Sequence, residues 1–318
     1  MSGSPRIVES LADVSLAGAG PVVLVVGTFD GVHLAHRELF REAVERARIL
    51  GGVAAVLTFR NHPREVVSPG NAPPLLTHWP RKRRLIEECG VDLLVGLAFD
   101  KALSEMPAES FIRDVVAGVF QAQEVISGPA FHFGHGGRGN AGLLLAMSRD
   151  LGYKYRCHEP VMWKGEKVSS TRIRRALAEG DVAAAAELLA RPHRNRGRVI
   201  TGDRLGRTIG FPTANLEIVD GTVVPANGVY AVMATVEGAR WPGMMNIGNR
   251  PTVGGVDRRF EVHLIGFDDD IVGRDVRVDY CERLRGEERF PGLDALRAQL
   301  AKDRDASLAV LRRIVDTP

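Results

Sequence analysis

Cysteine, tryptophan and tyrosine are scarce in this chain of 318 residues, which contains three, three and four of them. The cysteines Cys89, Cys157 and Cys281 are scattered and odd in number. This argues against a zinc site or a disulfide framework and fits a reducing cytoplasm. No apolar run exceeds the length of a strand, so we expect no membrane-spanning segment. Residues 1–5 lack the features of a signal peptide, and a cytoplasmic location is expected.

An excess of charge of either sign is also missing. Lysine and arginine number 42 against 39 aspartates and glutamates, for a formal net charge of +3. This balance is too mild for a nucleic-acid binder, and no basic block alternates with aromatic residues, so nucleic acid is not an expected partner. Two arginine-rich clusters, residues 81–84 and 191–198, are therefore predicted to be a solvated face and a linker, with phosphate contact as the alternative.

Strand-like and helix-like segments alternate through the first part of the chain. Residues 21–60 have the pattern of strand, helix and strand, and similar cues recur near residues 93–126. This alternation predicts a parallel sheet covered by helices on both faces, with ligands at the carboxyl ends of the strands. A helical run over 174–190 ends at Arg191-Pro192, where proline stops helix continuation, and we place a domain boundary there.

Beyond this boundary the pattern changes to short alternating strands separated by glycine and proline turns, such as 229–234 and 276–280. The change predicts a small antiparallel β-barrel. The helical spacing of apolar residues over 293–314 predicts a C-terminal helix packed on the barrel. The length suits about two domains, and the expected division is residues 1–190 and 191–318.

Two histidines follow an apolar strand and a glycine-containing turn. The strand is Val22–Val26, the turn is Gly27–Gly31, and His33 and His36 stand three residues apart at the start of a helix. Residues i and i+3 share a helix face, so both imidazoles lie at a helix N-terminus, where N–H groups and the dipole attract anions. The alternative is a pair of histidines that only cap the helix. The pattern predicts a triphosphate cradle formed by Gly27, Phe29, Asp30, Gly31, His33 and His36.

A second element with phosphate-binding chemistry lies far downstream, in the run Ser169-Ser170-Thr171-Arg172-Ile173-Arg174. The hydroxyl groups of Ser170 and Thr171 can donate to phosphate oxygens. Arg174 can fork onto the β- and γ-phosphates of a nucleotide and stabilise the pyrophosphate leaving group. The alternative is a simple cap for the helical run that follows, and the order of the two elements favours phosphate binding.

The histidine and serine elements together resemble the H-x-G-H and S-S-T-x-I-R signatures of nucleotidylyltransferases. The string from Gly27 to His33 narrows this resemblance to bacterial FAD synthetases. The resemblance implies a Rossmann-like adenylyltransferase domain in which His33, His36 and Arg174 act in catalysis.

Residues 128–140 resemble the flavin-site stretch of the same family. The resemblance implies that Phe131, Phe133, Arg138 and Asn140 bind the flavin or its nucleotide. Two positions depart from the family pattern. Ala35 replaces a glycine that would let the backbone approach phosphate closely, and Ala130 replaces a polar residue that would contact the flavin or help arrange nucleotide and metal.

The most specific string of the chain is Gly210-Phe211-Pro212-Thr213-Ala214-Asn215-Leu216, preceded by Gly206-Arg207. A glycine-rich, arginine-bearing turn can wrap phosphates with backbone N–H groups. Thr213 and Asn215 lie two apart, so in an extended segment they face one side. Two neutral oxygens suit Mg²⁺, which keeps waters and takes its other ligands from ATP phosphates. The alternative is a barrel with polar turns and no site.

Together with the segments around Asn246 and Glu261, this string resembles riboflavin kinase along the whole second half of the chain. The resemblance implies that Glu261 is the general base, which takes the proton of the ribityl hydroxyl as it attacks the γ-phosphate. It implies two metal ligands, Thr213 and Asn215. The implied binding residues are Gly206, Arg207, Gly210, Pro212 and Asn246.

The chain beyond about residue 20 thus resembles the bifunctional riboflavin kinase and FMN adenylyltransferase family. The resemblance implies ATP-dependent formation of FMN from riboflavin and of FAD from FMN, with Mg²⁺ as cofactor and small molecules as partners. The sequence leaves open whether the chain associates weakly into a homo-oligomer. It also leaves open two functional alternatives: a kinase whose N-terminal domain is weak or inactive because of Ala35 and Ala130, and a non-catalytic flavin- or nucleotide-binding paralogue.

Overall fold

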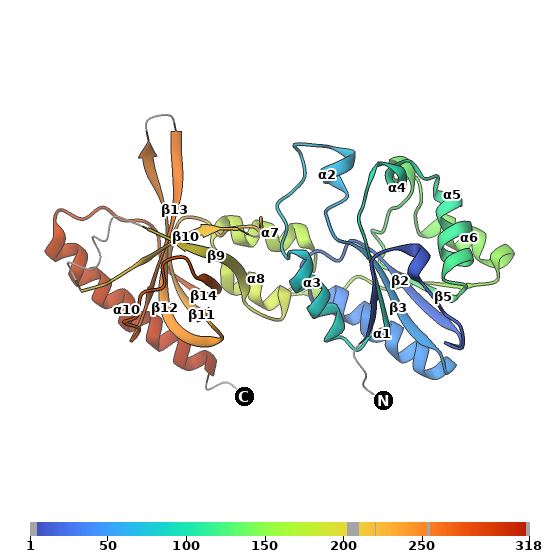
Figure 1. The fold of residues 1–318 in the computed structure, drawn as a ribbon, viewed down its shortest axis with the longest axis horizontal. Helices are drawn as coiled ribbons and strands as arrows, with labels where there is room; N and C mark the ends of the chain where they lie inside the picture. Colours follow the sequence, from blue (N-terminus) through green and yellow to red (C-terminus); the bar gives the residue numbers. More distant parts are fainter. Residues whose placement is uncertain (1–4, 202–209, 220, 253–254, 316–318) are drawn as a thin grey trace. The chain divides into compact units, whose positions relative to one another are not determined.

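Two compact units make up the chain, Met1–Ser170 and Thr171–Pro318 (Figure 1). The computed structural model describes residues 5–201, 210–219, 221–252 and 255–315. The first unit contains a parallel sheet and the second an antiparallel barrel. Both halves of the predicted fold class are therefore confirmed.

A six-stranded parallel sheet forms the centre of the first unit, in the order β1-β4-β3-β2-β5-β6. Strand β2 (Val22–Val26) pairs with β3 (Val53–Phe59) on one side and β5 (Ala122–Ser127) on the other. All five residues of β2 are buried, as expected for a central strand with both faces covered. The other strands are β1 (Arg6–Val8), β4 (Leu93–Leu97) and β6 (Lys154–Cys157).

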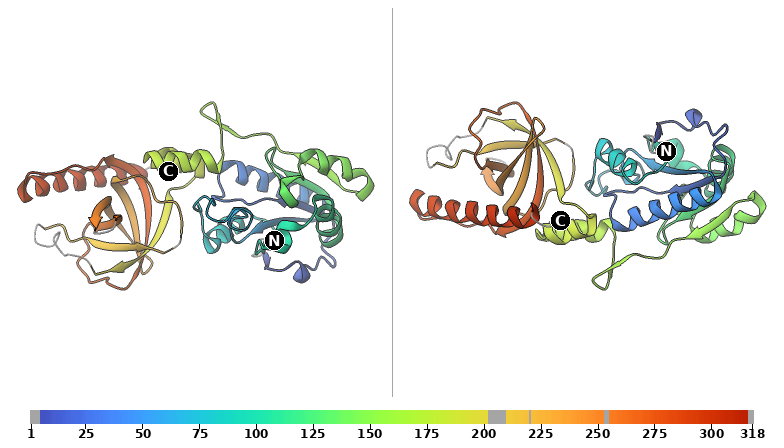
Figure 2. Two further views of the ribbon diagram at one scale, coloured as in Figure 1. Left: turned by 90° about the horizontal axis from the view of Figure 1, so that it is seen from above. Right: turned by 90° about the horizontal axis from the view of Figure 1, so that it is seen from below.

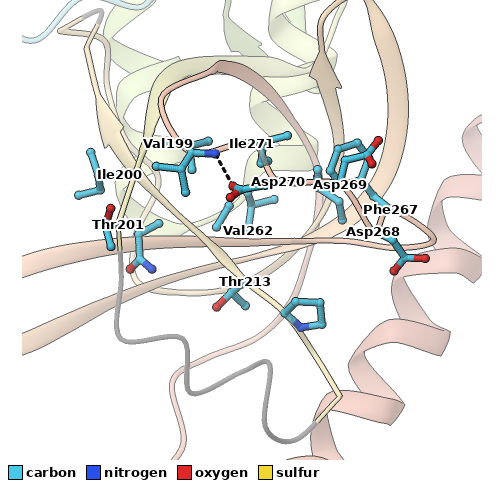
Figure 3. Close-up of a pocket in the computed structure, with 15 residues that line it drawn as sticks. Val199, Ile200, Thr201, Thr213, Val262, Phe267, Asp268, Asp269, Asp270 and Ile271 are labelled. Carbon is cyan, nitrogen blue, oxygen red and sulfur yellow. Dashed lines mark hydrogen bonds between the residues drawn. The ribbon is translucent and has the colours of Figure 1, made fainter.

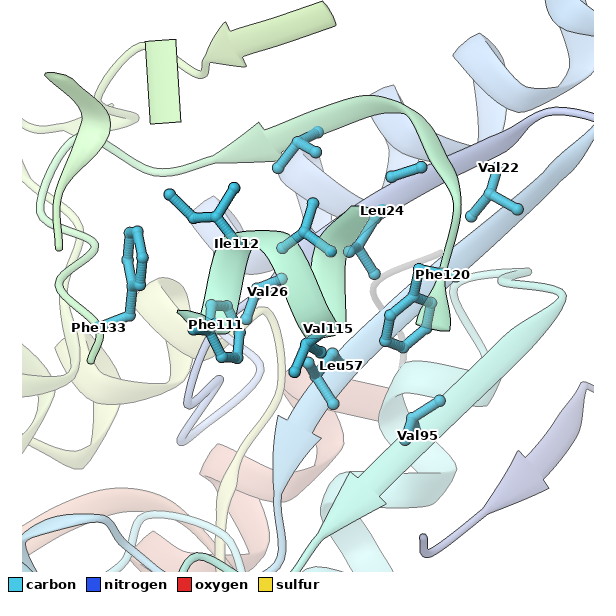
Figure 4. Packing of buried hydrophobic residues seen from close by; sticks show 14 of the residues in the cluster. Val22, Leu24, Val26, Leu57, Val95, Phe111, Ile112, Val115, Phe120 and Phe133 are labelled. Carbon is cyan, nitrogen blue, oxygen red and sulfur yellow. The ribbon is translucent and has the colours of Figure 1, made fainter. Parts of the chain in front are cut away.

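Alternate side chains of β2 enter two different hydrophobic cores, one on each face of the sheet. Val22, Leu24 and Val26 pack with the helical segment η2 (Phe111–Val119), as Figure 4 shows. The two valines between them pack with α1 (Leu34–Leu50) on the opposite face. Burial of each such side chain contributes about 1.5–3 kcal/mol. The turn that follows β2 therefore begins from a strand held on both faces.

Shorter elements connect the strands of this unit. Helix α1 ends at Gly51, whose φ of 66° is a left-handed conformation that terminates helices. The remaining helices are α2 (Arg64–Val67), α3 (Trp79–Glu87), α4 (Lys101–Glu105), α5 (Ala108–Ser110) and α6 (Ala141–Leu151). Single turns η1 (Leu11–Asp13) and η3 (His135–Gly137) and the hairpin β7 (Met162–Trp163) and β8 (Glu166–Lys167) complete the unit.

The second unit contains a closed barrel of antiparallel strands, in the order β10-β13-β12-β11-β14-β9, with β9 paired to β10. The strands are β9 (His193–Ile200), β10 (Ala214–Ile218), β11 (Gly228–Val236), β12 (Ala239–Thr252), β13 (Gly255–Leu264) and β14 (Asp275–Arg285).

The predicted linker over residues 191–198 is wrong, because most of this segment is strand β9. Buried and outward-facing residues alternate along β9, and its arginines are the outward-facing ones. Arg194 donates two hydrogen bonds to the Asp279 carboxylate of the neighbouring strand, at 2.6 and 2.5 Å. The charges that suggested a linker therefore cover the outside of the barrel.

Three helices accompany the barrel: α7 (Ser170–Glu179), α8 (Val182–Leu189) and α10 (Leu293–Val315). The single helix predicted over 174–190 is divided, because Gly180 has a φ of 80° and the Asp181 side chain caps a new helix. The predicted C-terminal helix is confirmed as α10, which lies along the barrel (Figure 2). Within the described residues, no helix is long and apolar enough to span a bilayer.

Candidate functional site

The turn between β2 and α1 carries both predicted histidines. His33 is the N-cap of α1, and its Nδ1 accepts a hydrogen bond from the backbone N–H of His36 at 3.4 Å. The two imidazole rings stack, with centroids 3.5 Å apart and planes 18° from parallel. The shared face predicted for the two rings is therefore confirmed. His33 also caps α1, which was the alternative role, so the two roles occur in one residue.

The backbone of this turn is held in conformations that few residues adopt. Phe29, Gly31 and Val32 have φ values of 48°, 90° and 42°. A β-branched residue at positive φ is strained, so its surroundings must fix the fully buried Val32. A Cβ on Gly27 would lie 2.6 Å from the ring of Phe29, which explains the glycine there. The same ring packs edge-on against His36, with 5.2 Å between centroids. The histidines thus stand on a rigid turn.

Asp30 joins the turn to two distant segments. Its carboxylate is buried and accepts hydrogen bonds from the backbone N–H groups of Leu76 at 3.0 Å and Thr77 at 3.1 Å. Its backbone carbonyl accepts a hydrogen bond from the Ser170 hydroxyl at 2.8 Å. The side chain expected to bind a nucleotide is therefore engaged with backbone amides. The same residue brings the two phosphate-binding sequence elements together.

Helix α7 begins with Ser170 at this contact. Thr171 is exposed and Arg174 is half-buried on the same helix. Residues i and i+4 share a helix face, so Ser170 and Arg174 project from one side of α7. The hydroxyl on this face donates to the Asp30 carbonyl, and the guanidinium of Arg174, a group that can donate to anions, follows it on the same side of the helix.

An aromatic pocket of about 200 Å³ opens beside the histidine turn. Thr28 of that turn lines it, together with residues at the carboxyl ends of β2 and β3. The ring of Phe131 stacks on Phe133 at 5.2 Å, and Phe133 lies 5.3 Å from Phe111. An apolar slot next to a helix N-terminus suits a planar ring that carries a phosphate.

The rest of the predicted flavin stretch lies around the pocket. Asn140 caps α6, with its Oδ1 accepting from the Leu143 N–H at 3.1 Å, and Arg138 is exposed. Ala130 is also exposed and does not line the pocket. The alanine that departs from the family pattern therefore lies outside the pocket wall.

Lys82 belongs to this region as well, and its position differs from the one predicted for it. The cluster 81–84 was predicted to be a solvated face, and at Lys82 this is wrong, since the residue is only 1% exposed. Its burial could have been predicted from its spacing. Lys82 lies three residues before Leu85 and four before Ile86, and these spacings place all three side chains on one face of α3. The arginine-rich neighbours concealed that periodicity.

The ammonium of Lys82 binds the ends of two strands. It donates to the carbonyl oxygen of Thr28 at 3.1 Å and to that of Phe59 at 2.5 Å. Burial lowers the pKa of Lys82 to about 8, and the nearby Asp30 carboxylate opposes this shift. The floor of the histidine turn thus contains a buried cationic group.

Three polar residues predicted for the second half lie in one row across three barrel strands. Antiparallel pairing sets Asn215 of β10 opposite Glu261 of β13, and Glu261 opposite Asn246 of β12. Directly paired residues project from the same face of a sheet, so the three side chains share a face. The Glu261 side chain is 27% exposed, and its Oε1 lies 3.7 Å from Nη1 of Arg259. A carboxylate is thus flanked by two carboxamides.

A cavity of about 400 Å³ lies against β10 (Figure 3). Thr213 and Asn215 line it, together with the acidic loop Asp268–Asp270. The ring Nδ1 of His263 lies 2.7 Å from the carbonyl oxygen of Pro212, which ties the start of this segment to β13. Burial lowers the pKa of His263. Neutral oxygens and carboxylates therefore form part of the wall of this cavity, beside apolar residues such as Val262 and Ile271.

Two predicted phosphate-binding residues, Gly206 and Arg207, lie outside the described residues. Gly210, which follows them, has a φ of 83°, a conformation that favours glycine. In the part of the chain that the structure describes, no group of three or more histidine, cysteine, aspartate or glutamate residues could hold a metal ion.

Family models match both halves of the chain. The model described as FAD synthetase matches residues 17–172, and the model described as Riboflavin kinase matches residues 189–311. The first match includes the histidine turn, the aromatic pocket and Ser170. The second includes the row of polar residues in the barrel.

Curated relatives match nearly the full length. The "Bifunctional riboflavin kinase/FMN adenylyltransferase" of Escherichia coli (strain K12) is 37% identical over 299 residues, which covers 94% of this chain and 95% of that protein. The protein of the same description from Bacillus subtilis (strain 168) is 35% identical over 294 residues, covering 90% and 91%.

A solved structure is similar over almost the whole chain. The crystal structure described as a macrolide-efflux protein from Streptococcus pneumoniae has a TM-score of 0.86 and 31% sequence identity, covering 96% of this chain and 99% of that one. The chain belongs to the family of bifunctional riboflavin kinases/FMN adenylyltransferases.

Proposed function

We propose that the two reactions of this family, phosphorylation of riboflavin to FMN and adenylylation of FMN to FAD, take place in separate domains of this chain. Adenylyl transfer is assigned to residues 1–190 and phosphorylation to residues 191–318. The observation that carries the first assignment is the hydrogen bond from Ser170 to the Asp30 carbonyl. It joins Ser170, at the start of the second phosphate-binding element, to the turn with paired histidines, beside an aromatic pocket.

In adenylyl transfer, a phosphate oxygen of FMN attacks the α-phosphorus of ATP and pyrophosphate leaves. Because Nδ1 of His33 accepts a hydrogen bond, the neutral ring carries its proton on Nε2, which can donate to a phosphate. His36 supplies a second ring and Thr171 a hydroxyl donor, while the Ser170 hydroxyl, which donates to the Asp30 carbonyl, holds this element against the turn. Arg174 stabilises the charge on the departing pyrophosphate. The cradle itself is the backbone of Gly27, Phe29, Asp30 and Gly31.

The aromatic pocket is assigned to the flavin ring. Phe131 and Phe133 offer stacked ring faces, and the pocket reaches Thr28 of the histidine turn, so a flavin there would carry its phosphate toward the nucleotide. Arg138 and Asn140 are assigned to the flavin or its nucleotide. Asn140 would combine that role with its cap on α6.

In phosphorylation, Glu261 takes the proton of the ribityl hydroxyl as that oxygen attacks the γ-phosphate of ATP. The pairing of Glu261 with Asn215 and Asn246 supports this role, because it sets an acceptor for the proton between two groups that can hold polar substrate atoms. The remaining residues are assigned to ATP or flavin binding: Gly206, Arg207, Gly210 and Pro212.

The oxygens of the larger cavity fit Mg²⁺. Thr213 and Asn215 offer a hydroxyl and a carboxamide oxygen, both in the cavity wall. Mg²⁺ commonly takes few protein ligands and fills its remaining positions with water and phosphate oxygens, so a cluster of three acidic or imidazole groups is not needed. When bound, the ion would neutralise charge on the ATP phosphates.

The composition supports the assignments of cellular location and of binding partners. Three scattered cysteines and a mild net charge suit a cytoplasmic chain that binds ATP and flavins rather than nucleic acid. Sedimentation of the purified protein over a range of concentrations tests for weak self-association.

Both activities should appear when the purified chain is incubated with ATP, Mg²⁺ and riboflavin, and the products are separated by chromatography. FMN should accumulate first, and FAD should follow from it. Formation of FMN without FAD would indicate a kinase with an inactive N-terminal domain. Formation of neither product would indicate a non-catalytic paralogue.

Replacing Ala130 with the polar residue of the family pattern should change FAD formation little. The side chain of Ala130 is exposed and lies outside the pocket wall, so Ala130→Asn is expected to leave the rate of FAD formation from FMN nearly unchanged. Steady-state rates of the two proteins at saturating ATP check this. A gain of tenfold or more would show that the missing polar group limits adenylyl transfer.

A further inference from the structure

Lys82 lies under the point where the histidine turn and the aromatic pocket meet. Its ammonium contacts two carbonyl oxygens, that of Thr28 within the turn and that of Phe59 at the end of β3. The Thr28 carbonyl also accepts a hydrogen bond from the Thr58 hydroxyl at 3.1 Å. Both Thr28 and Phe59 line the pocket. One buried side chain therefore holds two walls of the adenylyl-transfer site.

An aromatic ring of the same helix covers this ammonium, and the sheet leaves room for the ring. Nζ of Lys82 lies 5.9 Å from the ring centroid of Trp79, over the ring face. On β4, a Cβ at Gly96 would lie 2.2 Å from that ring, so the glycine makes room for it. Aromatic cover and two carbonyl acceptors offset much of the cost of removing a charged group from water.

Lys82 faces two carboxylates, Asp30 of the turn and Glu65 of α2. Both favour the charged ammonium, but burial outweighs them and lowers the pKa of Lys82 to about 8. The lysine is therefore charged at neutral pH, and it loses its proton under mildly alkaline conditions. Its other partners, two carbonyls and an indole ring, do not titrate.

We propose that Lys82 is a positioning residue for adenylyl transfer: its ammonium holds the ends of β2 and β3 in the arrangement that the histidine turn and the aromatic pocket require. This inference rests on the proposed function of the first domain. Charge-assisted hydrogen bonds are about twice as strong as neutral ones, so the charged lysine fixes the two carbonyls more firmly than the neutral amine.

Lys82→Met in the full chain is the direct test. Methionine keeps much of the length and removes the donors and the charge. We expect kcat for FAD formation from supplied FMN to fall about 10- to 100-fold, because small misplacements of reacting groups have effects of this size. FMN formation from riboflavin should be unchanged. Arg83→Met is the matched control, since Arg83 lies on the same helix with an exposed side chain, and it should leave both activities unchanged.

The pH dependence separates positioning from a purely structural role. In the wild type, the ratio of the FAD-forming to the FMN-forming rate should fall as pH rises through about 8, as Lys82 loses its charge. Stability should respond in the opposite sense. Between pH 8 and 10.5 the unfolded lysine keeps a proton that the folded one has lost, so the wild type should gain thermal stability relative to Lys82→Met.

Three results would overturn the inference. The first is wild-type kcat and KM for FAD formation in Lys82→Met. The second is an equal loss of both activities in that variant. The third is a wild-type rate ratio that stays flat from pH 7 to 10.5, the whole range in which a lysine with a lowered pKa loses its proton, and this measurement needs no substitution. A wild type that forms no FAD from FMN would instead refute the proposed function, before any variant is compared.

Discussion

Replacing Glu261 with glutamine should lower the rate of FMN formation by about two orders of magnitude or more, because a positioned base contributes about 10²–10⁴-fold. Glutamine preserves the size and much of the hydrogen bonding of the side chain, so riboflavin binding should be nearly unchanged. The expected signature is a fall in kcat with little change in the Kd for riboflavin. Initial rates of FMN formation and a fluorescence titration with riboflavin measure the two quantities.

Two comparisons control this result. Glu217→Gln changes an exposed carboxylate on β10 and should leave the kinase rate unchanged. FAD formation from supplied FMN should survive in Glu261→Gln, because its site is assigned to the other domain. A wild-type rate of riboflavin phosphorylation in Glu261→Gln would show that the assigned base is wrong.

Loss of either histidine of the N-terminal turn should reduce FAD formation about 10²–10³-fold, the effect of removing one donor that stabilises developing charge. His36→Ala is the simpler substitution. At His33 an alanine would also remove the N-cap of α1, at a cost of about 0.5–2 kcal/mol in stability. His33→Asn is therefore the better variant, since asparagine can keep the cap while removing the imidazole.

FMN formation by the same preparations is the internal standard for these histidine variants. It should be unaffected in both, and thermal unfolding should show little change in His33→Asn. If FAD and FMN formation fell together in a folded variant, the assignment of the two reactions to separate domains would be untenable.

The sequence was most informative where function depends on neighbours along the chain. The order of strand, glycine turn and paired histidines predicted their shared face, since a spacing of three residues determines direction on a helix. The role of Asp30 could not be predicted in this way. Its carboxylate binds the backbone of Leu76 and Thr77, and that contact depends on how a distant segment packs.

The same distinction holds for the barrel. Strands and glycine turns were recognisable from their alternation, and Glu261 from its resemblance to a family base. The alignment of Glu261 with Asn215 and Asn246 was not predictable, because it depends on the register of three strands. Register is set by which faces are buried, and a shift of one residue would turn the polar row to the opposite face.

The contact between Ser170 and Asp30 also concerns the order in which the protein is synthesised. All six strands of the parallel sheet have been translated once residue 157 is added, but the hydroxyl that reaches the Asp30 carbonyl comes thirteen residues later. Domains generally fold as units during translation. The contact that ties the nucleotide cradle to Ser170 is therefore made by a later part of the chain than the sheet itself, and any fragment that ends before residue 170 would lack the hydroxyl that ties it.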